Sequence, residues 1–257
     1  MPATSYRAAV ERIESLSYNV RGFRFKLLEP PTLDFKAGQF IILNVPKDLP
    51  AAPGLSAVPS PAQAGAAQAG GAVVKRAYSI ASPPYEQGIL EFAIQHVEGG
   101  AASTYLWQLK EGDPVSLTGP HGKFLIKEPL DYDPVFLALG TGVAPLRSMI
   151  KHLLHLNVTR DVWLLFGCRY EHAILYESEF RALASLRHNF HYIPTVSRPK
   201  EWHGEVGHIQ QTFQKYITNH SNKEMYLCGW LEVVKAVCTD LESYGIPKEK
   251  LHYEEWA

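Results

Sequence analysis

A cation, an aromatic ring and a hydroxyl stand together in the tetrapeptide Arg76-Ala-Tyr78-Ser79. The residues around it are typical of a strand, in which successive side chains alternate between faces. Arg76 and Tyr78 are therefore expected on one face and Ser79 on the other. A guanidinium beside a ring and a hydroxyl suits a ligand that carries both phosphate and planar rings. An ordinary strand would also accommodate these residues, so the tetrapeptide alone leaves both interpretations open.

Glycines mark a second candidate site at Gly140-Thr141-Gly142-Val-Ala-Pro145. They follow a continuous apolar run and precede a helical pattern, and glycine allows the backbone to approach a diphosphate closely. Pro145, near the first helical turn, removes no N–H that the helix needs. The spacing is not G-x-G-x-x-G, so the usual dehydrogenase fingerprint is absent, and a plain structural joint remains an alternative.

Two shorter motifs have strong structural alternatives. Cys228-Gly229 ends an apolar run, where the thiol is either a small buried hydrophobe or a soft side chain beside a redox ring. The segment 119–124, Gly-Pro-His-Gly-Lys-Phe, predicts a tight turn after a strand.

No metal site is predicted. The three cysteines are widely spaced without a C-x-x-C, which excludes a disulfide framework and a thiolate-bound cluster. His152 and His155 are three residues apart on a predicted helix, but no third ligand is near in sequence, so surface histidines are the better interpretation.

These motifs lie on two different patterns of elements. From Tyr6 to about Ile126 the apolar stretches are short and interrupted by Gly and Pro, which favours an antiparallel barrel or sandwich, with one helix at Ser103 to Leu109. After Asp133-Pro134 strands and helices alternate, which predicts a doubly wound parallel sheet. We therefore expect two domains, 1–130 and 131–257.

An unusual segment interrupts the first domain. Residues 51–72 contain 9 Ala, 4 Gly and 3 Pro among 22 residues and no charge. Such a composition buries too little surface to offset its ordering entropy, so a mobile insertion between two strands is expected.

Composition and charge narrow the class of protein. With 46% hydrophobic and 20% charged residues the chain is typical of a globular protein, and a net charge of -1 gives no overall attraction to nucleic acid or an anionic bilayer. No apolar run is long enough for a membrane span, and residues 1–14 lack the apolar core of a signal peptide. A cytoplasmic location is expected.

Taken together in order and spacing, six segments resemble the ferredoxin–NADP reductase superfamily, and the resemblance covers nearly the whole chain. It implies a six-stranded antiparallel β-barrel that binds FAD and a five-stranded parallel-sheet α/β domain that binds the nicotinamide nucleotide. The segments are R-A-Y-S at 76–79, G-G-A-A-S at 99–103, G-P-H-G-K-F at 119–124, G-T-G-V-A-P at 140–145, V-S-R at 196–198 and C-G at 228–229.

The resemblance also implies roles for residues on the FAD side. Arg76 would bind the FAD diphosphate, Tyr78 would lie against the flavin and ribityl, and Ser79 would hydrogen-bond near flavin N5. Gly100 and Ser103, at the opening of the predicted helix, would hold the same diphosphate.

On the nucleotide side, the resemblance places Gly140, Thr141 and Gly142 at the diphosphate of the coenzyme. Cys228 and Gly229 would lie beside the nicotinamide, with Ser79 and Cys228 as the catalytic pair.

The adenosine end of the coenzyme site gives mixed signals. Arg169, Ser197 and Arg198 end two successive strands and favour a 2′-phosphate, whereas Glu205 would repel it and could accept hydrogen bonds from a ribose diol. We expect both NADH and NADPH to work, with a preference for NADH of no more than about a hundredfold.

Three features are set against the family pattern, and the first is that the insertion at 51–72 is longer than the family's usual connection at that place. The chain ends Tyr253-Glu-Glu-Trp256-Ala rather than on an aromatic, so either ring could shield the flavin. Glu254 resembles a family carboxylate near the active cysteine, but the sequence favours a solvated terminal glutamate.

The resemblance therefore implies a flavoprotein reductase that takes hydride from NAD(P)H onto FAD and passes electrons to a separate acceptor. That acceptor could be a ferredoxin, a flavodoxin or an oxygenase component, since neither an iron-sulfur extension nor a globin domain is expected. Two alternatives stay open, namely a reductase of free flavin and a non-catalytic subunit that only carries electrons within a complex.

Overall fold

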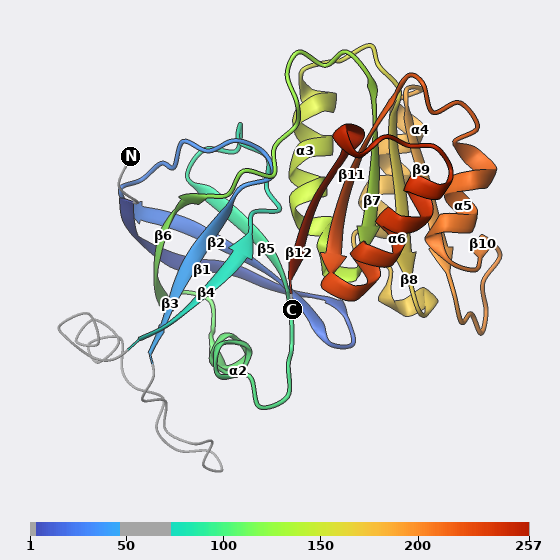
Figure 1. Ribbon diagram of the computed structural model, residues 1–257. Coiled ribbons are helices and arrows are strands. Elements are labelled where there is room, and N and C mark those ends of the chain that lie inside the picture. The colour runs from blue at the N-terminus through green and yellow to red at the C-terminus, as the bar shows by residue number, and fades with distance from the viewer. Residues whose placement is uncertain (1–3, 47–72, 257) are drawn as a thin grey trace.

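The computed structural model describes residues 4–46 and 73–256, and the insertion expected at 51–72 lies outside the described residues. The described chain forms two six-stranded sheets, one antiparallel and one parallel. Figure 1 shows the antiparallel sheet curling into a barrel-like body beside the helix-covered parallel sheet. The two-part architecture expected from the sequence is confirmed.

The antiparallel sheet has the strand order β4-β3-β6-β1-β2-β5. Inward-facing residues alternate with half-buried ones along β3 and β5, as expected for strands with one face on a core. Phe23, Phe25 and Phe92 are among the side chains that fill that core. The strands are β1 (Thr4–Ser17), β2 (Val20–Glu29), β3 (Phe40–Pro46), β4 (Val73–Ser79), β5 (Ile89–Gln95) and β6 (Pro114–His121).

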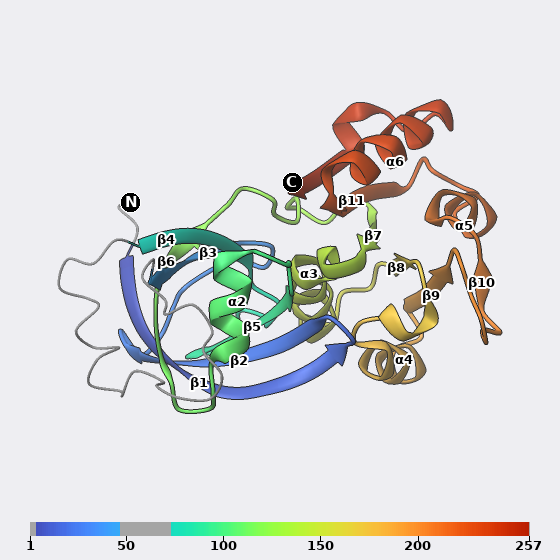
Figure 2. The same cartoon turned by 90° about the horizontal axis from the view of Figure 1, so that it is seen from below.

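One helix closes this body. Helix α2 (Ala101–Gln108) buries Ala102 and Leu106 in the barrel core, and Figure 2 shows it lying along the barrel beside β3. It begins two residues earlier than the helix predicted from Ser103, because the glycines before it end at Gly100.

The parallel sheet has the order β10-β9-β8-β7-β11-β12. It contains one strand more than the five implied by the resemblance, since the two-residue β10 pairs with β9 and gives too short a pattern for detection in sequence. The strands are β7 (Asp133–Leu139), β8 (Val162–Cys168), β9 (Phe190–Val196), β10 (Glu205–Val206), β11 (Lys223–Trp230) and β12 (Leu251–Trp256).

Helices cover both faces of this sheet, which makes it doubly wound. Apolar residues of α3 and α4 share one buried cluster with Phe136 and Phe166, whereas α5 and α6 share another with Leu137 and Leu165. The continuous apolar run of β7 follows from burial on both faces. The helices are α3 (Val143–His155), α4 (Glu177–Leu186), α5 (Ile209–Tyr216) and α6 (Leu231–Ser243), with short 3-10 turns η1 (Gly140–Gly142), η2 (Glu171–Ala173) and η3 (Lys248–Lys250).

The turn predicted over 119–124 is only partly correct. Gly119 to His121 continue β6, and the chain turns at Gly122, whose φ of 100° favours glycine. Within the two described ranges, no helix has the length and apolar character needed to cross a membrane.

Candidate functional site

The ends of β4 and β12 bring a hydroxyl and a carboxylate together across the two sheets. Ser79 Oγ donates a hydrogen bond to Glu254 Oε2 at 3.2 Å. Glu254 is half-buried, and burial raises its pKa, with the Ser79 hydrogen bond acting in the opposite direction. The interpretation of Glu254 as a solvated terminal glutamate is therefore wrong, because β12 pairs with β11 and carries this residue into the junction between the sheets.

Cys228 lies beside the same carboxylate. It is fully buried, and in the parallel ladder its neighbours are Ala138 on β7 and Glu254 on β12. Burial raises the pKa of its thiol well above the ordinary value, and the charge of Glu254 adds to that rise. The thiol is thus a neutral, soft group at neutral pH rather than a thiolate nucleophile.

The glycine segment after β7 packs directly against Cys228. A side chain at Gly142 would overlap the Cys228 carbonyl oxygen, so only glycine fits there. Gly140 has a φ of 57°, and with Thr141 it forms the turn η1 that leads into α3. The Val143 N–H at the start of α3 already donates to the Gly140 and Thr141 carbonyl oxygens, because η1 runs directly into α3. The N–H groups left for an anion are therefore those at the start of η1, which no side chain caps.

The start of α2 offers a second anion site, on the barrel. Gly100 is its N-cap and supplies no capping side chain. Ser103 is buried, and its hydroxyl accepts from Val97 N at 3.1 Å and lies 3.0 Å from the Val97 carbonyl oxygen. Ser103 therefore shapes the loop, and the N–H groups of the first helical turn are the groups left to bind a phosphate.

Arg76 and Tyr78 stand on β4 before Ser79. Arg76 is exposed and donates to the Lys75 carbonyl oxygen at 2.9 Å, and within the described ranges it has no carboxylate partner. Tyr78 is half-buried against the barrel core, and burial raises its pKa to about 12, so its hydroxyl stays protonated. A guanidinium that none of the described carboxylates pairs with, next to a neutral phenol, fits a ligand with a diphosphate and planar rings.

The loops after β8 and β9 lie side by side. Arg198 N donates to the Arg169 carbonyl oxygen at 2.8 Å, and Ser197 N donates to the Cys168 carbonyl oxygen at 3.0 Å. Arg169 and Arg198 are both exposed, and no carboxylate of residues 4–46 or 73–256 pairs with either.

The Glu205 carboxylate is hydrogen-bonded to side chains of helix α5. Its carboxylate accepts from Lys215 Nζ at 2.8 and 3.0 Å and from the Tyr216 hydroxyl at 2.6 Å. The hydrogen bond from Lys215 is the main cause of its lowered pKa. Helix α5 therefore places a cation and a hydroxyl beside the carboxylate that is expected to repel a 2′-phosphate and to accept from a ribose diol.

The two C-terminal aromatics face opposite ways. Alternation along β12 puts Trp256 on the same face as Glu254 and Tyr253 on the other. Trp256 packs against the cluster that contains Cys228, whereas Tyr253 is 52% exposed. Of the two candidates, Trp256 is the one directed toward the Ser79 and Cys228 junction.

Arg147 is a residue at this junction to which the sequence patterns assign no role. It is buried on α3 and connects the antiparallel sheet to helix α4, which covers the parallel sheet. A signal was present, because Arg147 falls on the helical stripe formed by Val143, Leu146 and Ile150, where a charge needs a partner.

Two domain families match the chain. The oxidoreductase FAD-binding domain matches residues 62–126, and the oxidoreductase NAD-binding domain matches residues 136–239. The glycine loop, α3 and Cys228 fall within the second match, and Arg76 to Ser79 and the start of α2 within the first.

Relatives also align over nearly the whole chain. The chain is 31% identical to ferredoxin–NADP reductase B of Sorangium cellulosum and covers 98% of it, with 99% of this chain aligned. It is 32% identical to the phenol hydroxylase P5 protein of Acinetobacter pittii, with 98% of this chain aligned, and spans 65% of that longer protein. The solved cytochrome P450 reductase of Amycolatopsis superimposes with a TM-score of 0.82 at 25% identity, covering 99% of this chain and 70% of that one.

Proposed function

Because the chain belongs to the ferredoxin–NADP reductase superfamily, with its FAD-binding and NAD-binding oxidoreductase domains, we propose that it is a flavoprotein reductase. It takes hydride from NAD(P)H onto bound FAD and delivers electrons to a separate acceptor. The contact between Ser79 and Glu254 carries the proposal, because it joins the strand end expected at the flavin to the strand beside Cys228.

The residues present fit FAD on the barrel domain, which we assign to residues 1–130. Arg76, with no described carboxylate partner, and the uncapped start of α2 at Gly100 would bind its diphosphate, and Tyr78 would lie against its ring system. When bound, the flavin supplies the conversion of a hydride pair into single electrons. Ser79 would then present its hydroxyl toward the reacting edge of the ring.

The nicotinamide nucleotide would bind on residues 131–257. Its diphosphate would lie on Gly140 to Gly142, where no side chain caps the N–H groups at the start of η1. The neutral thiol of Cys228, with Gly229 beside it, would form the floor under the nicotinamide. These chain atoms orient the coenzyme and exclude water, which is the protein's share of a hydride transfer.

The acceptor that the relatives favour is an oxygenase component or a ferredoxin. Similar proteins include the reductase component of a Pseudomonas phenol 2-monooxygenase and a Pseudomonas putida toluate 1,2-dioxygenase electron transfer component. We also propose a cytoplasmic location, since all three cysteines are free thiols, as is usual in a reducing compartment.

The visible spectrum of the purified protein tests the central proposal. We expect bound FAD at about one per chain, which NADH or NADPH bleaches under anaerobic conditions, and steady reduction of ferricyanide. Failure to bind added FAD would refute it. A colourless protein that reduces free flavin would favour the free-flavin alternative, and a yellow protein inert toward ferricyanide would favour a non-catalytic subunit.

A further inference from the structure

One guanidinium connects the antiparallel sheet to two helices that cover the parallel sheet. Arg147, on the second turn of α3, is 6% exposed, and its Nη1 donates to the Ala81 carbonyl oxygen at 2.8 Å and to Glu91 at 2.7 Å. Its Nε and Nη2 donate to the two carboxylate oxygens of Glu179, at 2.7 and 3.1 Å. The ring of Tyr176 lies 4.5 Å from the guanidinium carbon. A single side chain thus contacts the segment after β4, strand β5 and helix α4.

The next residue on α3 repeats the link. Ser148 is fully buried, and its hydroxyl donates to the Ser82 carbonyl oxygen at 2.7 Å. The two acceptors, Ala81 and Ser82, are consecutive carbonyl groups that follow Ser79 by two and three residues. Because α3 begins directly after Gly142, these bonds connect the nucleotide loop to the strand end that carries Ser79.

We propose that Arg147 is a positioning residue, which fixes the nucleotide loop relative to the Ser79 strand end and so sets the distance between nicotinamide and flavin. The inference rests on the proposed function. Hydride transfer depends steeply on approach geometry, and a displacement of about 1 Å can cost about a hundredfold in rate. A bidentate, buried guanidinium suits this task better than a flexible ammonium, because its planar fork fixes direction as well as distance.

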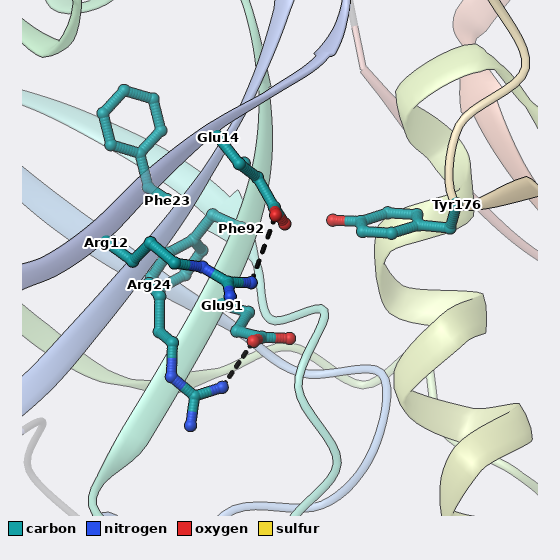
Figure 3. A pocket seen from close by; sticks show the side chains of 8 residues that line it. Arg12, Glu14, Phe23, Arg24, Glu91, Phe92 and Tyr176 are labelled. Carbon is teal, nitrogen blue, oxygen red and sulfur yellow. Dashed lines mark hydrogen bonds and ion pairs between the residues drawn. The ribbon is translucent and has the colours of Figure 1, made fainter. Parts of the chain in front are cut away.

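The carboxylates that bind Arg147 also have other cationic partners. Figure 3 shows Tyr176 extending toward the barrel, where Arg24 pairs with Glu91 at the edge of a small pocket that contains none of the predicted site residues. Glu91 therefore keeps Arg24 at 2.6 Å without Arg147, and Glu179 keeps Lys151 at 3.3 Å. Neither carboxylate would be left unpaired, so a variant at position 147 is expected to fold.

The test is Arg147→Met in the FAD-loaded protein, after the wild type has been shown to bind FAD and to react with NAD(P)H. We expect wild-type FAD content and a coenzyme Kd within about threefold, but a flavin reduction rate at saturating coenzyme at least about tenfold lower. A second readout is independent of activity, since amide hydrogen exchange over 143–149 should become faster when α3 loses its anchor.

Arg24→Met is the matched control. Arg24 also binds Glu91, but its partners all lie on the barrel side, so its removal should affect barrel stability and leave both readouts unchanged. The proposal is overturned if Arg147→Met behaves like Arg24→Met in rate and exchange. Should Arg147→Met fail to fold, Arg147→Lys and Ser148→Ala decide by the same criteria. A wild type without FAD would refute the proposed function itself.

Discussion

Cys228 and Glu254 are paired residues on the adjacent parallel strands β11 and β12, so they lie side by side. Ser79 reaches the same carboxylate from the barrel at 3.2 Å, so three residues distant in sequence meet where the two sheets adjoin. Burial is the main cause of the raised pKa of both Cys228 and Glu254, so the surrounding protein disfavours the charged form of each group.

Glu254 should give the stability of the protein a specific pH dependence. Because its folded-state pKa is raised, the folded state binds more protons than the unfolded state between the ordinary and the raised value, and the free energy of unfolding falls as pH rises through that window. Glu254→Gln should flatten this slope in denaturant titrations at several pH values. Glu255→Gln, at an exposed neighbour, should keep the wild-type slope. Equal slopes for the wild type and Glu254→Gln would contradict the raised pKa.

Cys228→Ser should slow flavin reduction without releasing FAD. A hydroxyl in the thiol's fully buried position is smaller and more polar, which disturbs the proposed floor of the nicotinamide site. We expect a loss of at least about tenfold in stopped flow, or ~1.4 kcal/mol of barrier. Cys238→Ser, on the opposite side of the sheet on α6, should react at the wild-type rate. An unchanged rate for Cys228→Ser would show that Cys228 is only a buried core residue and does not contribute to the nicotinamide site.

Arg76→Ala should weaken FAD retention. The variant removes a charge-assisted contact to the proposed diphosphate, worth about 1.5 to 3 kcal/mol, which corresponds to roughly tenfold or more in Kd. Titration of the apoprotein with FAD measures it. Lys75→Ala is the control, because Lys75 is exposed on the same strand and points to the opposite face. Equal affinities for the two variants would show that Arg76 does not touch the diphosphate.

Local patterns in the sequence predicted the architecture well. Short interrupted strands in the first part of the chain and alternating strands and helices in the second part predict the two sheets. The continuous apolar run 135–139 predicts a strand that is buried on both faces, as β7 is. Contacts between distant segments could not be predicted in this way. The position of Glu254 at the junction depends on the pairing of β12 with β11, which no local pattern shows. The partner of Glu205 is Lys215, ten residues later in the chain on α5. The sequence does show Arg147 as a charged residue on an apolar helical stripe, which indicates that it needs a partner. It does not show which partners, because they lie after β4, on β5 and on α4.

The pair formed by Glu205 and Lys215 should tune coenzyme choice. With its carboxylate balanced by Lys215 at 2.8 Å, Glu205 repels a 2′-phosphate less than a free carboxylate would, and Arg169 and Arg198 remain available to attract it.

Opposite variants of that pair test the placement. Glu205→Gln leaves Lys215 without its partner and should raise the ratio of kcat/KM for NADPH over NADH by about tenfold, or ~1.4 kcal/mol. Lys215→Met leaves Glu205 with its charge unbalanced and should lower the same ratio. Steady-state kinetics with both coenzymes measure the two ratios at low ionic strength, where screening is weakest. Since both changes break one ion pair, a purely structural effect would move both ratios in the same direction. Opposite shifts require the adenosine end of the coenzyme to lie within reach of this pair.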